Sequence, residues 1–341
     1  MNNKSFQIEG RDIGPEFPPY LISELSANHN RNLDTALRLI DLAAKTGADA
    51  VKIQTYTADT ITLNSTRPEF QITSGKWAGK SLYQLYEEAC TPWEWHPALF
   101  DRARKLGIVM FSSPFDNTAV DLLESLNAPA YKIASFEAVD LPLIKYVAST
   151  GKPMIISTGM ADVGEISEAI EAARDGGCKE LAILHCVSGY PAPAEDYNLL
   201  TIPDMIKRFN LVTGLSDHTL DNTTAITAVA LGASIIEKHM TENRNGGGPD
   251  DSFSLEPSEF SKLCADSRTA WNALGGVDYG RQSSETDNAT FRRSLYFVKN
   301  MKAGETITAA HFRSIRPGFG AAPKLSNIII GMRVLEETQS G

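Results

Sequence analysis

The sequence has few cysteines and no segment able to anchor it in a membrane. Its four cysteines, Cys90, Cys178, Cys186 and Cys264, form no C-x-x-C pair. This spacing argues against a disulfide framework or a zinc site and predicts reduced thiols. No apolar run approaches the ~20 residues that a membrane helix needs, and residues 1–5 precede no apolar segment typical of a signal peptide. We therefore expect a cytoplasmic protein with no membrane partner.

The chain also lacks an excess of basic charge. It carries 32 lysines and arginines against 42 aspartates and glutamates, for a net charge of −10. Nucleic-acid binding usually relies on a strongly basic surface, so this balance argues against a nucleic-acid partner. The net charge does not exclude a small anionic substrate, because local lysines determine that kind of binding. The length of 341 residues allows one large domain, or a large and a small one.

A glycine-rich first turn, usual in doubly wound nucleotide-binding sheets, is missing as well. Instead, short apolar runs alternate with stretches of helix length, and amphipathic helices are expected over 34–45, 118–126 and 165–173. The apolar runs cover residues 20–24, 50–54, 108–112, 130–133, 154–157, 181–185, 211–215 and 234–238. About eight alternations predict a (β/α)8 barrel, also called a TIM barrel, with a doubly wound sheet as the alternative.

The barrel pattern ends near residue 274. Residues 275–289 are polar and turn-prone, which predicts a linker, and residues 290–341 predict a small second domain with strand-like pieces at 294–298 and 328–330. A longer segment at 55–106 interrupts the alternation. We expect it to add a loop and a helix over the barrel mouth. The predicted division is therefore a barrel over 1–274, a linker over 275–289 and a second domain over 290–341.

Polar side chains follow nearly every predicted strand. The carboxyl ends of parallel barrel strands meet at one mouth, so we expect these side chains to converge there. They are Glu24, Lys52, Gln54, Ser113, Lys132, Ser135, Glu137, Ser157, Ser188, Tyr190, Ser216, His218 and His239. Taken singly, each has a structural interpretation, such as a salt-bridged lysine or a serine that caps a helix.

The kinds of side chain suggest a site with two ends. Lys52 and Lys132, together with the small serine donors, could bind a phosphate or carboxylate. His218 and His239 follow consecutive strands, and two neutral imidazoles are half of a divalent metal site. The remaining candidates are Glu24 and Glu137 for acid–base chemistry, Gln54 and Tyr190 for polar substrate groups, and Asp250 from the loop after the last strand.

Several strings, in order along the chain, resemble the sialic acid synthase family. They include Glu-Leu-Ser-Ala-Asn-His-Asn at 24–30, Tyr-Lys-Ile-Ala-Ser-Phe-Glu at 131–137, Gly-Leu-Ser-Asp-His at 214–218 and Glu-Lys-His at 237–239. The tail, with Arg-Pro-Gly at 316–318, resembles that family's antifreeze-like (SAF) domain. Segments 82–86 with 91–95, 247–254 and 314–320 are most similar to the pseudaminic acid synthase branch. Ser113 and Ser188 stand where the N-acetylneuraminate branch has Thr and Asn.

The resemblance implies a metal-dependent transferase that condenses phosphoenolpyruvate with an open-chain amino sugar, giving a nine-carbon 2-keto acid and phosphate by C–O cleavage. In this branch the sugar is 2,4-diacetamido-2,4,6-trideoxy-L-altrose and the product is pseudaminic acid; N-acetylneuraminate and legionaminic acid synthases are the alternatives. The positions matching phosphoenolpyruvate contacts are Lys52, Ser113, Lys132, Ser135, Ser157, Ser188 and Ser216. Those matching sugar contacts are Glu24, Gln54, Tyr190, Asp250 and Arg316.

The resemblance also assigns the catalytic group and the cofactor. His218 and His239 match the ligands of a divalent metal, Mn²⁺ first, with Mg²⁺ or Co²⁺ as alternatives. Glu137 matches the acid–base position, and Lys132 is counted with the catalytic residues. Arg316 matches an arginine inserted into the partner subunit's barrel, which implies a domain-swapped homodimer. Two other classes stay open: a barrel aldolase or isomerase acting on a sugar phosphate, and a non-enzymatic sugar- or ice-binding protein.

Overall fold

The protein is described by a computed structural model over residues 5–75 and 77–341. Its chain separates into two compact units, Met1–Gly275 and Gly276–Gly341, which are treated one at a time. The first residues, where the sequence predicts no signal peptide, lie partly outside the described part. Within the described ranges, no helix combines the length and the apolar character needed to cross a membrane.

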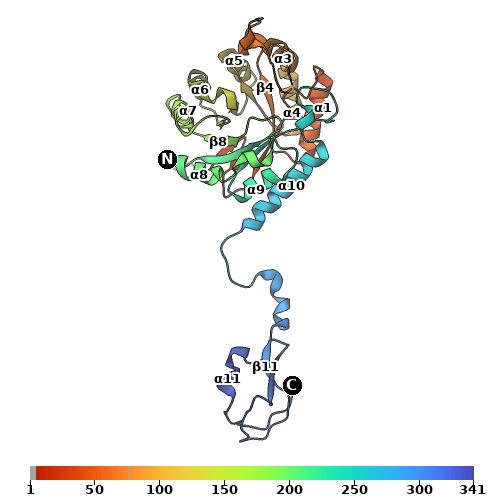
Figure 1. The fold of residues 1–341 in the computed structure, drawn as a ribbon, viewed down its shortest axis with the longest axis vertical. Helices are drawn as coiled ribbons and strands as arrows, with labels where there is room; N and C mark the ends of the chain where they lie inside the picture. Colours follow the sequence, from red (N-terminus) through yellow and green to blue (C-terminus); the bar gives the residue numbers. More distant parts are fainter. Residues whose placement is uncertain (1–4, 76) are drawn as a thin grey trace. The chain divides into compact units, whose positions relative to one another are not determined.

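The first unit is built on a closed barrel of parallel strands (Figure 1). The strands are β3 (Tyr20–Glu24), β4 (Ala50–Thr55), β5 (Val109–Pro114), β6 (Tyr131–Ile133), β7 (Met154–Ser157), β8 (Leu181–Cys186), β9 (Val212–Asp217) and β10 (Ile235–His239). β10 pairs with β3 and closes the ring. The predicted (β/α)8 barrel is confirmed, and the doubly wound sheet is excluded because such a sheet stays open.

Helices surround the strands (Figure 1). They are α1 (Leu33–Thr46), α4 (His96–Leu106), α5 (Asn117–Ser125), α6 (Leu141–Ala148), α7 (Val163–Asp175), α8 (Thr201–Phe209), α9 (Thr223–Ala230) and α10 (Pro257–Leu274). In α1, Ala36, Leu39 and Ala43 recur at helical spacing and are buried, while the Asn32 side chain accepts a hydrogen bond from the Thr35 amide at the N-cap. The expected helices at 34–45, 118–126 and 165–173 correspond to α1, α5 and α7 within two residues at each end.

The lower part of the barrel interior is apolar. Side chains alternate along each strand, and the inward ones include Ile22, Phe111 and Leu184. An antiparallel hairpin, β1 (Phe6–Ile8) with β2 (Arg11–Ile13), contributes to the same apolar cluster. Gly214 of β9 belongs to this packing, because a Cβ there would lie 2.3 Å from the Ile235 carbonyl oxygen. Polar inward side chains are therefore left to the upper end of the strands.

The segment between β4 and β5 contains more than the barrel helix α4. It holds α2 (Ala58–Ile61), η1 (Pro68–Phe70), α3 (Leu82–Ala89) and η2 (Trp93–Trp95). The Trp77 ring lies 6.2 Å from the ring of Tyr190, which follows β8. The segment thus brings an aromatic side chain to the end of the barrel where the strands finish.

The second unit has a small sheet in which β11 (Ser294–Phe297) pairs with β12 (Phe312–Ile315) in antiparallel fashion. Leu295, Met301, Ile307, Phe312 and Val334 form its buried cluster. This sheet is consistent with the expected antifreeze-like domain, while the domain boundaries remain predictions. The predicted strand at 328–330 is wrong, because a turn opened by Pro323 continues into α11 (Ser326–Ile329). Three successive isoleucines have no periodicity that would separate strand from helix.

Candidate active site

One pocket opens at the carboxyl ends of the barrel strands, and we call it the mouth pocket. Its lining residues are Glu24, Lys52, Gln54, Lys132, Ala134, Ser135, Ser157, Cys186, Tyr190, Ser216, His218, Glu237 and His239. They come from seven of the eight strands or from the residues that directly follow them. The remaining strand, β5, contributes through Ser113, which accepts a hydrogen bond from Lys52 Nζ at 3.2 Å.

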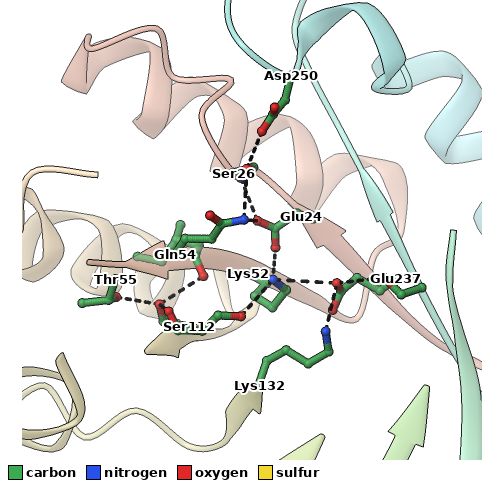
Figure 2. A network of polar contacts seen from close by, with 12 residues as sticks. Glu24, Ser26, Lys52, Gln54, Thr55, Ser112, Lys132, Glu237 and Asp250 are labelled. Carbon is green, nitrogen blue, oxygen red and sulfur yellow. Dashed lines mark hydrogen bonds and ion pairs between the residues drawn. The ribbon is translucent and has the colours of Figure 1, made fainter. Parts of the chain in front are cut away.

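Alternating charges cross the floor of the mouth pocket (Figure 2). Lys52 forms an ion pair with Glu24, and its Nζ lies 3.7 Å from Glu237 Oε1. Lys132 Nζ lies 3.4 Å from the same Glu237 oxygen. All four side chains are buried. Burial works against ionisation of Glu237, yet Lys132 and Lys52 outweigh it and hold the pKa of that carboxyl below its ordinary value. Burial raises the pKa of Glu24 and lowers that of Lys132, so the carboxyl and amino groups alternate along one network without all being held as firm charges.

The network continues from Glu24 toward the loop after β10 (Figure 2). Glu24 Oε1 accepts hydrogen bonds from the Ser26 amide at 2.9 Å and from Gln54 Nε2 at 3.3 Å. Ser26 Oγ in turn donates to Asp250 at 2.5 Å. Asp250 is thus connected to the pocket through Ser26, although it is not itself part of the lining.

The serines of the site differ in how they are bonded. Ser135 Oγ and Ser188 Oγ lie 2.9 Å apart, and Ser216 Oγ donates to Glu237 Oε1 at 3.4 Å. Ser157 Oγ is buried and has no partner among the described residues. A buried hydroxyl normally has a partner, so Ser157 is free to bind a ligand in this pocket.

A glycine keeps this side of the pocket open. Gly159 follows β7 with φ +49°, and a Cβ at that position would lie 2.5 Å from the Cβ of Ser135 and 3.1 Å from Ser188 Oγ. Only glycine combines this left-handed backbone with so close an approach. The loop after β7 can therefore lie directly against the Ser135–Ser188 pair.

His218 and His239 stand side by side, with ring centroids 5.4 Å apart. His218 Nδ1 donates to the Val187 carbonyl oxygen at 2.8 Å. Burial opposes protonation of this ring, but the neighbouring Cys186 outweighs it and raises the pKa of His218, so a metal would have to displace a proton there. His239 Nδ1 is buried without a partner in the described chain. Burial and the nearby cationic groups lower the pKa of His239 well below its ordinary value, so the ring is neutral. A neutral, partly unpaired imidazole such as that of His239 is the form in which histidine binds a divalent metal.

The described residues contain no cluster of three or more His, Cys, Asp or Glu side chains arranged around a metal position. The two histidines would therefore supply only part of a coordination shell. Such an incomplete shell is usual for catalytic metals, which keep positions for water and substrate.

The outer face of the same strands holds a second set of charges. Lys238 Nζ donates to Asp217 Oδ2 at 2.6 Å, to the Thr219 carbonyl oxygen at 2.7 Å and to Thr219 Oγ1 at 3.1 Å. Lys238 and Asp217 are both buried. Because all three ammonium protons have acceptors, this pair supports the strands that carry the histidines.

Besides Ser113, Ser188 and Asp250, two further predicted residues, Glu137 and Arg316, are not among the lining residues. Glu137 sits in η3 (Ser135–Val139), where burial raises the pKa of its carboxyl to about 7. Its Oε2 has no partner within the described ranges. Arg316 belongs to the second unit, where its guanidinium lies 5.9 Å from the Phe291 ring centroid.

Comparison with known proteins assigns the family. The model of the NeuB family matches residues 39–279. A pseudaminic acid synthase of Campylobacter jejuni is 41% identical over 322 residues, covering 94% of each chain. The chain belongs to the NeuB family. An N,N'-diacetyllegionaminic acid synthase of Campylobacter jejuni is 36% identical and covers 88% of this chain and 91% of its own length.

Solved structures agree with this NeuB-family assignment. The N-acetylneuraminic acid synthetase of Leptospira borgpetersenii superposes with a TM-score of 0.74 at 30% identity. The match covers 83% of this chain and 94% of that one. The family and the barrel predicted from the sequence are therefore both confirmed.

Most of the predicted site residues are brought together in this NeuB-family barrel. Those lining the mouth pocket are Glu24, Lys52, Gln54, Lys132, Ser135, Ser157, Tyr190, Ser216, His218 and His239. Ser113, Ser188 and Asp250 are joined to it by hydrogen bonds. The individual roles of all these residues remain predictions.

Sequence reasoning gave no role to Glu237, although it contacts both pocket lysines. A signal was present, because Glu237 is two residues before His239 on β10 and so points to the same side. The same alternation turns Lys238 outward.

Proposed function

We propose that this protein condenses phosphoenolpyruvate with 2,4-diacetamido-2,4,6-trideoxy-L-altrose to give pseudaminic acid and phosphate. The observation that carries the proposal is the mouth pocket itself, in which a lysine–serine end faces a two-histidine end. The relative from Campylobacter jejuni with 41% identity over nearly the whole chain supports this choice of sugar.

The lysine–serine end suits phosphoenolpyruvate, which carries a phosphate and a carboxylate. Lys52 and Lys132 supply the positive charge, while Ser157 Oγ offers an unpaired hydroxyl. Glu24 and Glu237 form ion pairs with these ammonium groups. Binding of the substrate anions would give the lysines a second set of negative partners.

His218 and His239 would hold a divalent cation, for which we propose Mn²⁺. When bound there, the cation would act as a Lewis acid toward the sugar aldehyde. The residues around it orient the substrates: Tyr190 lies beside His218 with ring centroids 4.5 Å apart, and Gln54 lines the same pocket. Holding C3 of phosphoenolpyruvate against C1 of the sugar replaces a difficult bimolecular encounter.

The proposed reaction forms one C–C bond and breaks one C–O bond. C3 of phosphoenolpyruvate attacks the aldehyde carbon, and the aldehyde oxygen takes up a proton. Water then adds to C2 and loses one proton. Phosphate leaves with the bridging oxygen and takes up the proton of the new C2 hydroxyl, whose oxygen becomes the keto oxygen. Glu137 is our candidate for exchanging these protons, because a carboxyl with a pKa of about 7 can both give and accept them near neutral pH.

The test is product formation from defined substrates. Purified protein is incubated with Mn²⁺, phosphoenolpyruvate and, in parallel, the diacetamido altrose, the legionaminic acid precursor and N-acetylmannosamine. We expect phosphate release and a nine-carbon keto acid with the first sugar. Preference for either other sugar would reassign the substrate, and no turnover with any would reject the function. Phosphoenolpyruvate labelled with ¹⁸O at the bridging position should release the label in phosphate.

The metal assignment has a separate test. His239→Gln should abolish high-affinity Mn²⁺ binding, which is measured by calorimetry or by the Mn²⁺ paramagnetic resonance signal. His311→Gln, in the second unit, is the matched control and should bind Mn²⁺ like the wild type. Unchanged Mn²⁺ binding by His239→Gln would remove the histidines from the site.

We also propose a domain-swapped homodimer in which Arg316 acts in the partner's barrel. Arg316→Ala and His239→Gln should each be inactive alone. If Arg316 acts in the partner, mixed dimers of the two variants regain activity, because one barrel has intact histidines and receives an intact arginine. No recovery after co-refolding would contradict the exchange.

A further inference from the structure

Three aromatic rings form a row at the edge of the mouth pocket, and of these only Tyr190 lines the pocket itself. The row consists of Trp77 from the segment between β4 and β5, Tyr190 after β8, and Phe253 in η5 (Asp251–Phe253). Tyr190 stands in the middle, with its ring centroid 5.4 Å from Phe253 and 6.2 Å from Trp77. The row therefore joins three segments that are far apart in the sequence, and the proposed chemistry gives no role to Trp77.

Trp77 carries a donor without an acceptor. Its Nε1 is buried and makes no hydrogen bond within the described chain. A buried indole N–H normally finds a partner, because leaving it unpaired costs free energy. A bound ligand with an acceptor at this point would remove that cost.

The order of the rings indicates which part of the sugar reaches Trp77. Tyr190 contacts both His218 and His239, whereas no ring contact joins Trp77 to either histidine among the described residues. Trp77 is thus one ring farther from the histidines. If the aldehyde carbon binds at the histidine end, the carbons of the open chain beyond C3 would extend past Tyr190 toward Trp77.

We infer that Trp77 is a specificity-determining residue that binds the distal acetamido group of the acceptor sugar. The indole N–H donates to the acetamido carbonyl, and the indole face packs on its methyl group. An acetamido group offers the acceptor and the apolar surface together, whereas a hydroxyl at the same carbon offers no methyl group. This inference rests on the proposed function and adds the residue that separates diacetamido sugars from N-acetylmannosamine.

The test is Trp77→Phe, which keeps an aromatic ring and removes the N–H. Relative to the wild type, kcat/KM for the diacetamido sugar should fall roughly tenfold through a higher KM for the sugar. The KM for phosphoenolpyruvate, kcat and kcat/KM for N-acetylmannosamine should stay unchanged. Trp77→Ala should lower kcat/KM for the diacetamido sugar further. The matched control is Trp271→Phe on α10, because the Trp271 Nε1 already has an acceptor, the Pro15 carbonyl oxygen at 3.2 Å, and its ring has no contact with Tyr190 among the described residues.

The results separate this inference from the proposed function. If the wild type turns over the diacetamido sugar and Trp77→Phe has the same KM as Trp271→Phe, the inference fails and the function stands. An equal loss for both sugars, or a higher KM for phosphoenolpyruvate, would indicate a merely structural role and overturn it as well. If the wild type uses only N-acetylmannosamine, both the function and the inference fail.

Discussion

Strands β9 and β10 carry buried ionisable side chains on both faces. The polar atoms of these side chains have hydrogen-bond partners on the outer face, whereas some on the inner face have none among the described residues. On the outer face, the Lys238 ammonium has three acceptors, one from Asp217 and two from Thr219. On the inner face, Glu237 Oε2 and His239 Nδ1 have no partner among the described residues. Burial and charge alone would not separate the two sets. Unpaired polar atoms mark the face that receives a ligand, and saturated ones mark the face that supports it.

The largest expected effect is on the outer face. Lys238→Met leaves the buried Asp217 carboxylate and the Thr219 acceptors without the ammonium. Breaking a buried pair by removing one partner typically costs about 3–5 kcal/mol. We expect the free energy of unfolding in urea to fall by that amount. The double variant Asp217→Leu/Lys238→Met should recover most of it, and a loss below about 1 kcal/mol in the single variant would show that the pair resembles an exposed one.

The second largest expected effect is a loss of activity when Lys132 is replaced, a residue on the inner face of the barrel at β6. Lys132→Met is chemically the same change, but Glu237 keeps Ser216 at 3.4 Å and Lys52 at 3.7 Å. Stability should therefore change much less than in Lys238→Met. Removing one preorganised charge from a site typically costs about 10²–10³ in rate, and we expect that loss in kcat/KM for phosphoenolpyruvate. If Lys132→Met and Lys238→Met lowered the free energy of unfolding equally, the inner and outer faces would not differ in how much their buried ion pairs contribute to stability.

The barrel and most of the mouth pocket could be predicted from the sequence for a local reason. Strand–helix alternation and the polar residues at strand ends are features of short segments, and a parallel barrel brings those ends together whatever the loops do. Lys52, Lys132, His218 and His239 were found in this way.

What could not be predicted depends on neighbours in space. The contact of Glu237 with Lys52 requires β10 to close on β3 and β3 to pair with β4. The contact of Trp77 with Tyr190 depends on the path of an irregular segment, for which the sequence has no periodic pattern. The strand wrongly predicted at 328–330 fails for the same reason, since an apolar run without a period fits a helical turn equally well.

A third prediction uses the pH dependence of stability. Burial raises the pKa of Glu137 to about 7, so the folded state binds its proton more tightly than the unfolded state does. The unfolded state then releases its proton first as the pH rises, and the wild type loses stability through the interval between the ordinary carboxyl pKa and about 7.

Glu137→Gln cannot ionise and should lack this loss. The unfolding midpoint of the wild type, relative to the variant, should therefore be lower at about pH 8 than at about pH 5. Glu168→Gln on the exposed side of α7 is the control and should follow the wild type at both pH values. Parallel midpoints for the wild type and Glu137→Gln would show that Glu137 has an ordinary environment.

The smallest expected effect compares two buried hydroxyls that have no partner in the described chain, Ser157 in the mouth pocket and Ser267 on α10. Neither Ser157→Ala nor Ser267→Ala breaks a hydrogen bond, so both should leave the free energy of unfolding within about 0.5 kcal/mol of the wild type. Only Ser157→Ala should raise the KM for phosphoenolpyruvate, by roughly 10-fold, the low end of what one hydrogen bond to a charged group contributes. A buried hydroxyl can lack a partner because a ligand supplies it or because its packing offers none. The KM for phosphoenolpyruvate distinguishes these two cases, whereas the free energy of unfolding does not. If Ser157→Ala matched Ser267→Ala in both measurements, an unpaired atom on the inner face would no longer mark a ligand contact.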